Sequence, residues 1–242
     1  MALHTVVLRS PSQEHPSDLK PPPIAFLNGK WHITHSTLPM WKSRRNVQIT
    51  YTPLPSSHDS TSGQRIAVID DLVQFYTSSG DKQHTVHGVD TALIEDSTKL
   101  PGQLVNIREG DEQEVVSDWA WKWRGKGLLM IASTTWEVLG YGEEGPQSAE
   151  GVIPEPVQRN WYDSNVWKEA QGMGNRWMVT YFQKTLFTPA GIDVYSRDPN
   201  GLRTETLEGI KTRLAEISEL KELAGKMFEI SMDASDGKHP VQ

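Results

Sequence analysis

The chain has 242 residues, a mass of 27.2 kDa and a formal net charge of −7 at pH 7, with a pI of about 5.6. This length suffices for one domain with a full core. The acidic balance argues against a basic field that would attract nucleic acid or anionic lipid, so we expect a neutral or apolar small molecule as the partner. The absence of cysteine excludes disulfides, thiolate metal sites and cysteine nucleophiles.

The first nine residues include an apolar patch that is too short and too interrupted for a signal peptide. No apolar run approaches the length of a membrane span. We therefore expect a cytoplasmic protein, and we predict no oligomeric state.

Composition also sets the expected domain boundaries. Residues 1–24 form a polar leader that ends in Pro21-Pro22-Pro23 and is expected to be extended or disordered. A single domain is expected over 25–230, followed by a flexible tail over 231–242.

Alternating apolar and polar residues, which indicate a strand with one buried face, recur along the chain. Asp70-Asp71 interrupts the third of these runs, where we expect a bulge or a bend. The expected strands are 29–36, 46–52, 65–76, 83–89, 118–127, 128–139, 176–187 and 191–197, with a further short strand at 104–107.

After residue 201 the apolar period changes to three or four residues, which predicts an amphipathic helix over about 204–228. Lys and Glu fill its other face. We expect this helix to pack on the outside of the strands rather than to bind a partner.

Three tryptophans in the 118–127 strand, Trp119, Trp121 and Trp123, are spaced by two and share one face. Lys122 and Arg124 occupy the opposite face and place it in solvent. The tryptophans are therefore expected to point inward. They either line an aromatic cavity or fill a wide interior, and both interpretations stay open.

In the 176–187 strand, Trp177 shares a face with Val179, Tyr181 and Gln183. If Lys184 points to solvent, this face lies inside, together with Tyr51 and the Trp31 face of the first strand. The candidate donors or acid–base groups are Tyr51, Tyr181, Gln183 and His35.

A long segment without a strand pattern, 140–174, contains an aromatic stretch with Trp161 and Tyr162. This stretch is either a lid over the open end or a loop that packs on the outer wall. The candidate ligand-binding residues are Trp119, Trp121, Trp123, Trp136, Trp177, Val179, Trp161 and Tyr162.

No dinucleotide-binding, Walker, esterase-elbow or zincin motif occurs, so we expect no cofactor. His84 and His87 fall on opposite faces of a strand, and so do His32 and His35. Neither pair has suitable geometry for one metal ion, and no metal site is expected.

The stretch Asn28-Gly29-Lys30-Trp31 resembles the first-strand signature of the calycins, which include lipocalins and fatty-acid-binding proteins. Together with residues 123–129 and 185–197, it is similar to fungal lipocalin-like proteins of specialised-metabolite pathways over about 26–200. The resemblance implies a mainly β fold, a single antiparallel up-and-down β-barrel with a C-terminal helix. It also implies a structural role for Gly29 and Trp31, with Arg197 packed across the tryptophan.

Related fungal proteins include pericyclases that perform Diels–Alder closures on polyketides, but those have two barrels and this chain has room for one. We favour a cofactor-free cyclase or isomerase acting on a polyketide- or terpenoid-like substrate. The first alternative is a non-catalytic carrier of a lipophilic ligand, such as a fatty acid or a haem held by His35, His84 or His87. The second is an interaction or structural role.

Overall fold

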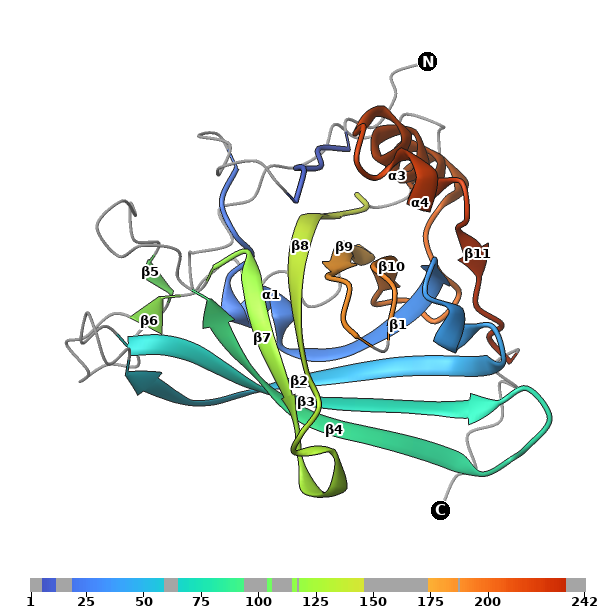
Figure 1. Ribbon diagram of the computed structural model, residues 1–242. Coiled ribbons are helices and arrows are strands. Elements are labelled where there is room, and N and C mark those ends of the chain that lie inside the picture. The colour runs from blue at the N-terminus through green and yellow to red at the C-terminus, as the bar shows by residue number, and fades with distance from the viewer. Residues whose placement is uncertain are drawn as a thin grey trace.

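Eight antiparallel strands close into an up-and-down barrel in which the last strand pairs with the first (Figure 1). The computed structural model describes residues 6–11, 19–58, 65–93, 104–105, 115–116, 118–145, 174–186 and 188–233. The barrel strands are β1 (Gly29–Ser36), β2 (Arg44–His58), β3 (Arg65–Thr77), β4 (Gln83–Leu93), β7 (Ala120–Gly125), β8 (Ser133–Glu143), β9 (Arg176–Phe182) and β10 (Gly191–Ser196). The predicted mainly β fold is confirmed.

Shorter elements extend or flank the barrel. β11 pairs with the end of β1, and β6 pairs in parallel with the start of β3. These elements are α1 (Ile24–Leu27), η1 (Pro39–Trp41), β5 (Leu104–Val105), β6 (Val115–Val116), η2 (Gly127–Leu129), α3 (Thr204–Glu216), α4 (Lys221–Ala224) and β11 (Phe228–Glu229).

Two details of the predicted strands are wrong. β3 pairs with β2 and β4 without interruption through Asp70 and Asp71, so the expected bulge is absent. Residues 128–132 do not start a strand, because η2 and a turn occupy them. Gly127 has a positive φ of 60°, and the Gly125 N–H donates to the Ala132 carbonyl at 3.1 Å, which closes this connection before β8 begins.

The barrel has two different ends. Because successive strands run in opposite directions, the connections β1–β2, β3–β4, β7–β8 and β9–β10 all lie at one end, which we call the mouth. Its connections are 37–43, 78–82, 126–132 and 183–190. At the mouth the Thr37 N–H donates to the Ile192 carbonyl at 2.9 Å, and the Ser78 N–H donates to the Ser43 carbonyl at 3.0 Å. α1 lies at the other end, where β1 begins (Figure 1).

Arg197 organises the end that holds α1. Its guanidinium lies 3.7 Å from the centre of the Trp31 ring and donates to the carbonyl oxygens of Lys30, Phe26 and Asn28 at 2.6 to 2.7 Å. The chain turns beside it at Gly29, where φ is +99° and an added Cβ would lie 3.1 Å from Arg197 Nη1. A side chain at residue 29 would therefore be strained and crowded.

The apolar core is divided by the barrel wall. The larger cluster takes side chains from all eight barrel strands, α1 and η1, and lies inside. The smaller cluster lies outside, where Trp177, Val179 and Val194 pack against Ile210 and Leu214 of α3. The helix therefore packs on the outer wall of β9 and β10 (Figure 1).

The predicted single helix over 204–228 is broken. α3 ends at Glu216 because Ile217 has an extended backbone with φ −79° and ψ 112°. The chain then turns into the four residues of α4, and Leu220 is fully buried in the outer cluster. The last predicted helical residue, Phe228, lies in β11 instead.

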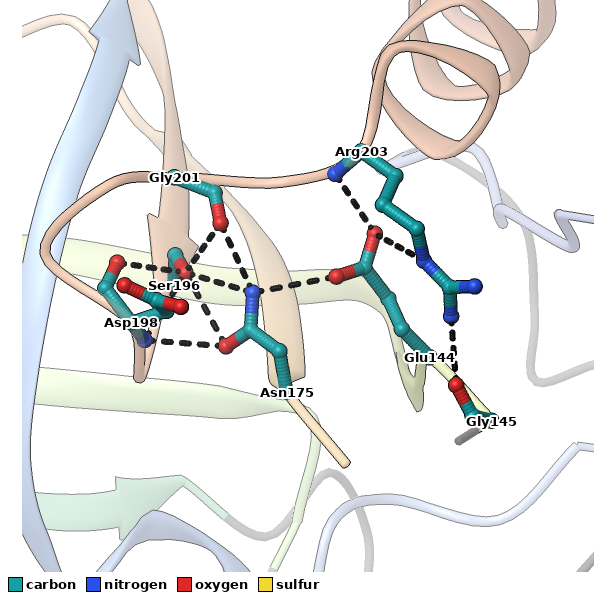
Figure 2. A network of polar contacts seen from close by, with 7 residues as sticks. All are labelled: Glu144, Gly145, Asn175, Ser196, Asp198, Gly201 and Arg203. Atoms are coloured by element: carbon teal, nitrogen blue, oxygen red, sulfur yellow. Dashed lines mark hydrogen bonds and ion pairs between the residues drawn. The ribbon is translucent and has the colours of Figure 1, made fainter. Parts of the chain in front are cut away.

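A polar network joins the start of α3 to the barrel (Figure 2). Asn175 Nδ2 lies within hydrogen-bond distance of Ser196 Oγ at 2.9 Å and the Gly201 carbonyl at 2.8 Å. Glu144 accepts from the Arg203 N–H at 2.8 Å, just before the first helical residue. These contacts hold the chain between β10 and α3 against the ends of β8 and β9.

Candidate functional site

Three aromatic rings stack across the inside of the barrel. The Trp136 ring lies between those of Tyr51 and Trp121, with centroids 5.9 Å apart and planes 13° apart on each side. All three side chains are buried. Such offset stacks are favourable beyond the area that they bury. The rings themselves therefore fill part of the interior.

A pair of buried carboxyl groups faces this stack. Asp71 lies on β3 and Asp90 on β4, and the Trp136 Nε1–H donates to Asp90 Oδ1 at 2.7 Å. Burial first, and the charge of Asp70 second, raise the pKa of Asp71 to about 7. Burial, and then the charge of Asp71, also raise the pKa of Asp90 well above its usual range. At neutral pH this pair holds a proton that it can donate.

Several polar atoms inside the barrel, two of them in the pair itself, are buried without a hydrogen bond of ordinary geometry to a described residue. The Tyr195 hydroxyl is one of them, and its pKa is raised by burial first and then by the charge of Asp193, with the charge of Asp71 as a smaller cause. The Tyr195 hydroxyl interacts with Tyr51 and Thr180, and the Asp71 carboxyl interacts with that of Asp90. Because a buried polar atom without a well-formed hydrogen bond is costly, the group indicates a place for a polar ligand atom or water. These atoms are Asp71 Oδ1, Asp90 Oδ2, Trp121 Nε1, Thr180 Oγ1 and the Tyr195 hydroxyl.

Nearer the mouth, a third buried carboxyl group lies on the same face of β10 as Tyr195. Asp193 accepts hydrogen bonds from Ser36 Oγ of β1 and, at 3.2 Å, from Trp41 Nε1 of η1. Burial raises its pKa to about 7, although both hydrogen bonds act in the opposite direction. Asp193 thus attaches the β1–β2 connection to the barrel wall.

Of the predicted inward residues, Tyr51, Trp119, Trp121 and Trp136 lie in the inner cluster, and Trp123 packs against it while partly buried. The inward assignment of the Trp177 face is wrong. Trp177 and Val179 belong to the outer cluster, and Tyr181 packs beside them.

The error in β9 has a simple cause. β9 ends at Phe182, so Lys184 lies beyond the strand and its exposure does not report which strand face is inside. Met178, on the opposite face to Trp177, lies in the inner cluster instead. Gln183 also lies past the strand end and is exposed.

His35 is not inside the barrel either. The pairing of β1 with β10 shifts between Ile33 and His35, and this irregularity breaks the alternation that starts at Trp31. Burial and then Lys211 of α3 lower the pKa of His35, which places the ring on the helix side of the wall. The lid candidates Trp161 and Tyr162 lie outside the described residues.

Sequence reasoning missed Asp71 because the pair Asp70-Asp71 suggested a break in the strand. It missed Asp90 because the predicted strand 83–89 ended one residue before it, whereas β4 continues to Leu93. The alternation of apolar and polar residues in β3 nevertheless indicates that Asp71 is buried. Asp71 falls in the apolar series of β3 together with Ala67, Ile69, Val73 and Phe75, whereas Asp70 falls on the outer face. A carboxylate within an apolar face indicates a buried functional or structural group.

The described histidines do not form a metal centre. His87 lies outside the barrel, where Nε2 is 2.9 Å from both Asp70 carboxylate oxygens, and the His84 ring stacks on Phe75. Within the described ranges, no group of three or more His, Asp or Glu side chains could hold a metal ion. No helix in the same ranges is long and apolar enough to cross a bilayer.

We compared the chain with known proteins. No protein-family model matches it, and no curated protein matches it. The barrel is compatible with a lipocalin-like fold.

Proposed function

We propose that the protein encloses a hydrophobic polyketide- or terpenoid-like molecule in its barrel and catalyses a cofactor-free isomerisation or cyclisation of it in specialised metabolism. The observation that carries the proposal is the buried pair Asp71 and Asp90, which faces stacked aromatic rings and buried polar atoms without a hydrogen bond of ordinary geometry. The aromatic rings supply apolar contact, at about 25 cal/mol per Å² of apolar surface removed from water.

The chemistry needs no co-reactant. The neutral carboxyl group of the pair gives its proton to an oxygen or an alkene carbon of the substrate. The resulting carboxylate later takes a proton from another substrate atom, so that the pair returns to its starting state. The Tyr51 hydroxyl, whose pKa burial raises well above its usual range, stays protonated and can orient a substrate oxygen.

This role differs from the predicted one in its residues. Tyr51 is still a candidate hydrogen-bond donor, and Trp121 and Trp136 are still candidate apolar contacts for the ligand. Asp71 and Asp90 replace Tyr181, Gln183 and His35, which lie outside the inner cluster.

The test compares conversion by variants. Purified protein is incubated with a lipophilic extract from its host deleted for this gene, and products are compared by mass and retention time. We expect one compound to be replaced by another of identical mass. Asp90→Asn and Asp71→Asn should each lower this conversion by about 10²–10⁴-fold, because general acid–base catalysis contributes about that much.

Asp81→Asn is the matched control. Asp81 is fully exposed in the β3–β4 connection, where it contacts Arg45, so its loss should leave conversion unchanged. Compounds that bind and are released unchanged would contradict catalysis and indicate a carrier. Full activity in both Asp71→Asn and Asp90→Asn would contradict the acid–base role.

A further inference from the structure

The mouth carries most of the exposed apolar side chains in the described part of the protein. Five of the seven large exposed hydrophobic residues lie in its connections, and the two others, Val7 and Leu54, lie elsewhere. Two of the five are almost completely in solvent, Ile131 at 98% and Leu186 at 95%. The remaining three are Met40, Leu129 and Met130. They come from three separate connections, so the apolar tips surround the barrel opening.

The same end is strongly basic. The segments 37–45, 77–83, 122–133 and 183–190, which are the mouth connections with the strand ends next to them, contain eight of the 24 Lys and Arg residues of the chain. They contain only one of its 31 Asp and Glu residues, Asp81. Two further acidic residues, Glu229 and Asp233, also lie at this end, because β11 pairs with the last residues of β1 and Asp233 pairs with Arg45. Elsewhere the balance is reversed: segments 94–118 and 144–175 together contain twelve acidic and four basic residues.

Most of these basic side chains are not neutralised by neighbours. Lys126 is paired with Asp70, and Arg45 is paired with Asp81 and Asp233. The other six form no ion pair with a described residue, and all but Arg44 are exposed. These six are Lys42, Arg44, Lys82, Lys122, Arg124 and Lys184.

We propose that the mouth docks on an anionic lipid bilayer. An anionic bilayer presents a layer of headgroups above a layer of acyl chains. The exposed aliphatic side chains can enter the boundary of the acyl layer, while the long basic side chains remain among the headgroups. An acidic protein partner would explain the charge. It would not explain why the two most exposed apolar side chains, Ile131 and Leu186, project from two separate connections instead of one contiguous apolar patch.

Docking would place the barrel opening against the phase in which a lipophilic compound is dissolved. The use of docking to collect a substrate rests on the proposed function, whereas docking itself does not. The net charge of −7 led to the expectation that no basic surface attracts anionic lipid. That expectation did not consider that the acidic residues lie mainly in other segments.

The test is co-sedimentation of the full chain with vesicles that contain no substrate. We expect binding to phosphatidylcholine vesicles that contain phosphatidylserine, weak binding to phosphatidylcholine alone, and loss of binding as salt is raised. The variant Lys122→Gln/Arg124→Gln/Lys184→Gln should bind anionic vesicles roughly 100-fold more weakly at low salt. Ile131→Ser/Leu186→Ser should bind them roughly tenfold more weakly.

Two controls match these variants. Lys20→Gln/Lys30→Gln/Arg213→Gln changes the net charge equally, but its residues lie before α1, at the start of β1 and on α3. Leu54→Ser removes an exposed aliphatic side chain from the part of β2 away from the mouth. Both should keep vesicle binding. No binding to anionic vesicles, or equal losses in the controls, would overturn the proposal. Because the vesicles hold no substrate, this outcome is independent of whether Asp90→Asn abolishes conversion.

Discussion

Asp193 shows how burial alone can make a carboxyl group respond to pH near neutrality. Its pKa is raised from 3.8 to about 7, so between these values the unfolded chain loses the proton while the folded chain keeps it. Stability from this residue is therefore fully present below about pH 4 and is lost as the pH rises through about 7. The hydrogen bonds from Ser36 and Trp41 are too weak to reverse the effect of burial.

The variant Asp193→Asn removes this titration and keeps a neutral side chain of the same shape. Relative to the wild type, its free energy of unfolding should rise by roughly 4 kcal/mol between pH 4 and pH 8. Urea unfolding at several pH values measures this difference. Asp71 and Asp90 titrate in the same direction but are present in both proteins, so their contributions cancel. A difference that does not change with pH would show that the pKa of Asp193 is not raised.

Arg197 has a structural role at the opposite end. Burial lowers the pKa of Arg197 to about 9, which shows that burying its charge is unfavourable. Hydrogen bonds to backbone carbonyls and the contact with the Trp31 ring offset this unfavourable free energy. Arg197→Ala should reduce stability by about 2–4 kcal/mol and lower Tm by about 5–15 °C, because the carbonyls lose their donor.

Arg197→Lys is the useful comparison for this residue. An ammonium group lacks the planar fork that reaches Lys30, Phe26 and Asn28 together, so lysine should not restore the melting temperature. Conversion per folded molecule should remain normal in both variants. A variant that melts normally but has lost activity would contradict the structural assignment.

At the scale of elements, the N-terminal segment is fastened to β8 by a buried ion pair. The Arg9 guanidinium contacts the Glu137 carboxylate, and their side chains are only 4% and 6% exposed. The Arg9 N–H also donates to the Leu139 carbonyl at 2.8 Å, and Val6 and Leu8 are buried in the outer cluster. Residues 6–9 of the predicted leader are thus an integral part of the wall.

A double-mutant cycle tests this contact. Arg9→Met or Glu137→Leu alone should each lower the free energy of unfolding by about 3–5 kcal/mol, because each leaves one charge buried without its ionic partner. The combined variant should lose less than either single variant, since two apolar side chains then replace the pair. Urea unfolding of the four proteins provides the comparison. Additive losses would mean that the two residues act independently.

At the scale of the whole molecule, the barrel wall separates an inner core from an outer core, and the mouth differs in character from the rest of the surface. The inner core holds the stacked aromatic rings and the carboxyl pair, while the outer core attaches α3 and α4 to β9 and β10. The mouth is basic and tipped with apolar side chains. The proposed acid–base role of the carboxyl pair and the proposed docking of the mouth on lipid are compatible with each other, because both concern a lipophilic compound.

The resemblance of Asn28-Gly29-Lys30-Trp31 to the calycin signature implied the barrel class and the first strand. Local patterns were enough to predict most other strand positions and the inward direction of Trp121. The reason is that alternation with period two reports the buried face wherever a strand is regular. The same rule failed at His35, where the pairing is irregular, and at Tyr181, where the inference depended on a residue beyond the strand end.

The candidate site itself depended on tertiary structure. Asp71 and Asp90 are 19 positions apart, and only the pairing of β3 with β4 brings them together inside an apolar barrel that raises their pKa values. The mouth likewise exists only after closure, which gathers four connections that are distant in the chain. Strand formation is decided by neighbouring residues, whereas burial, proton affinity and surface charge are decided by what folding places side by side.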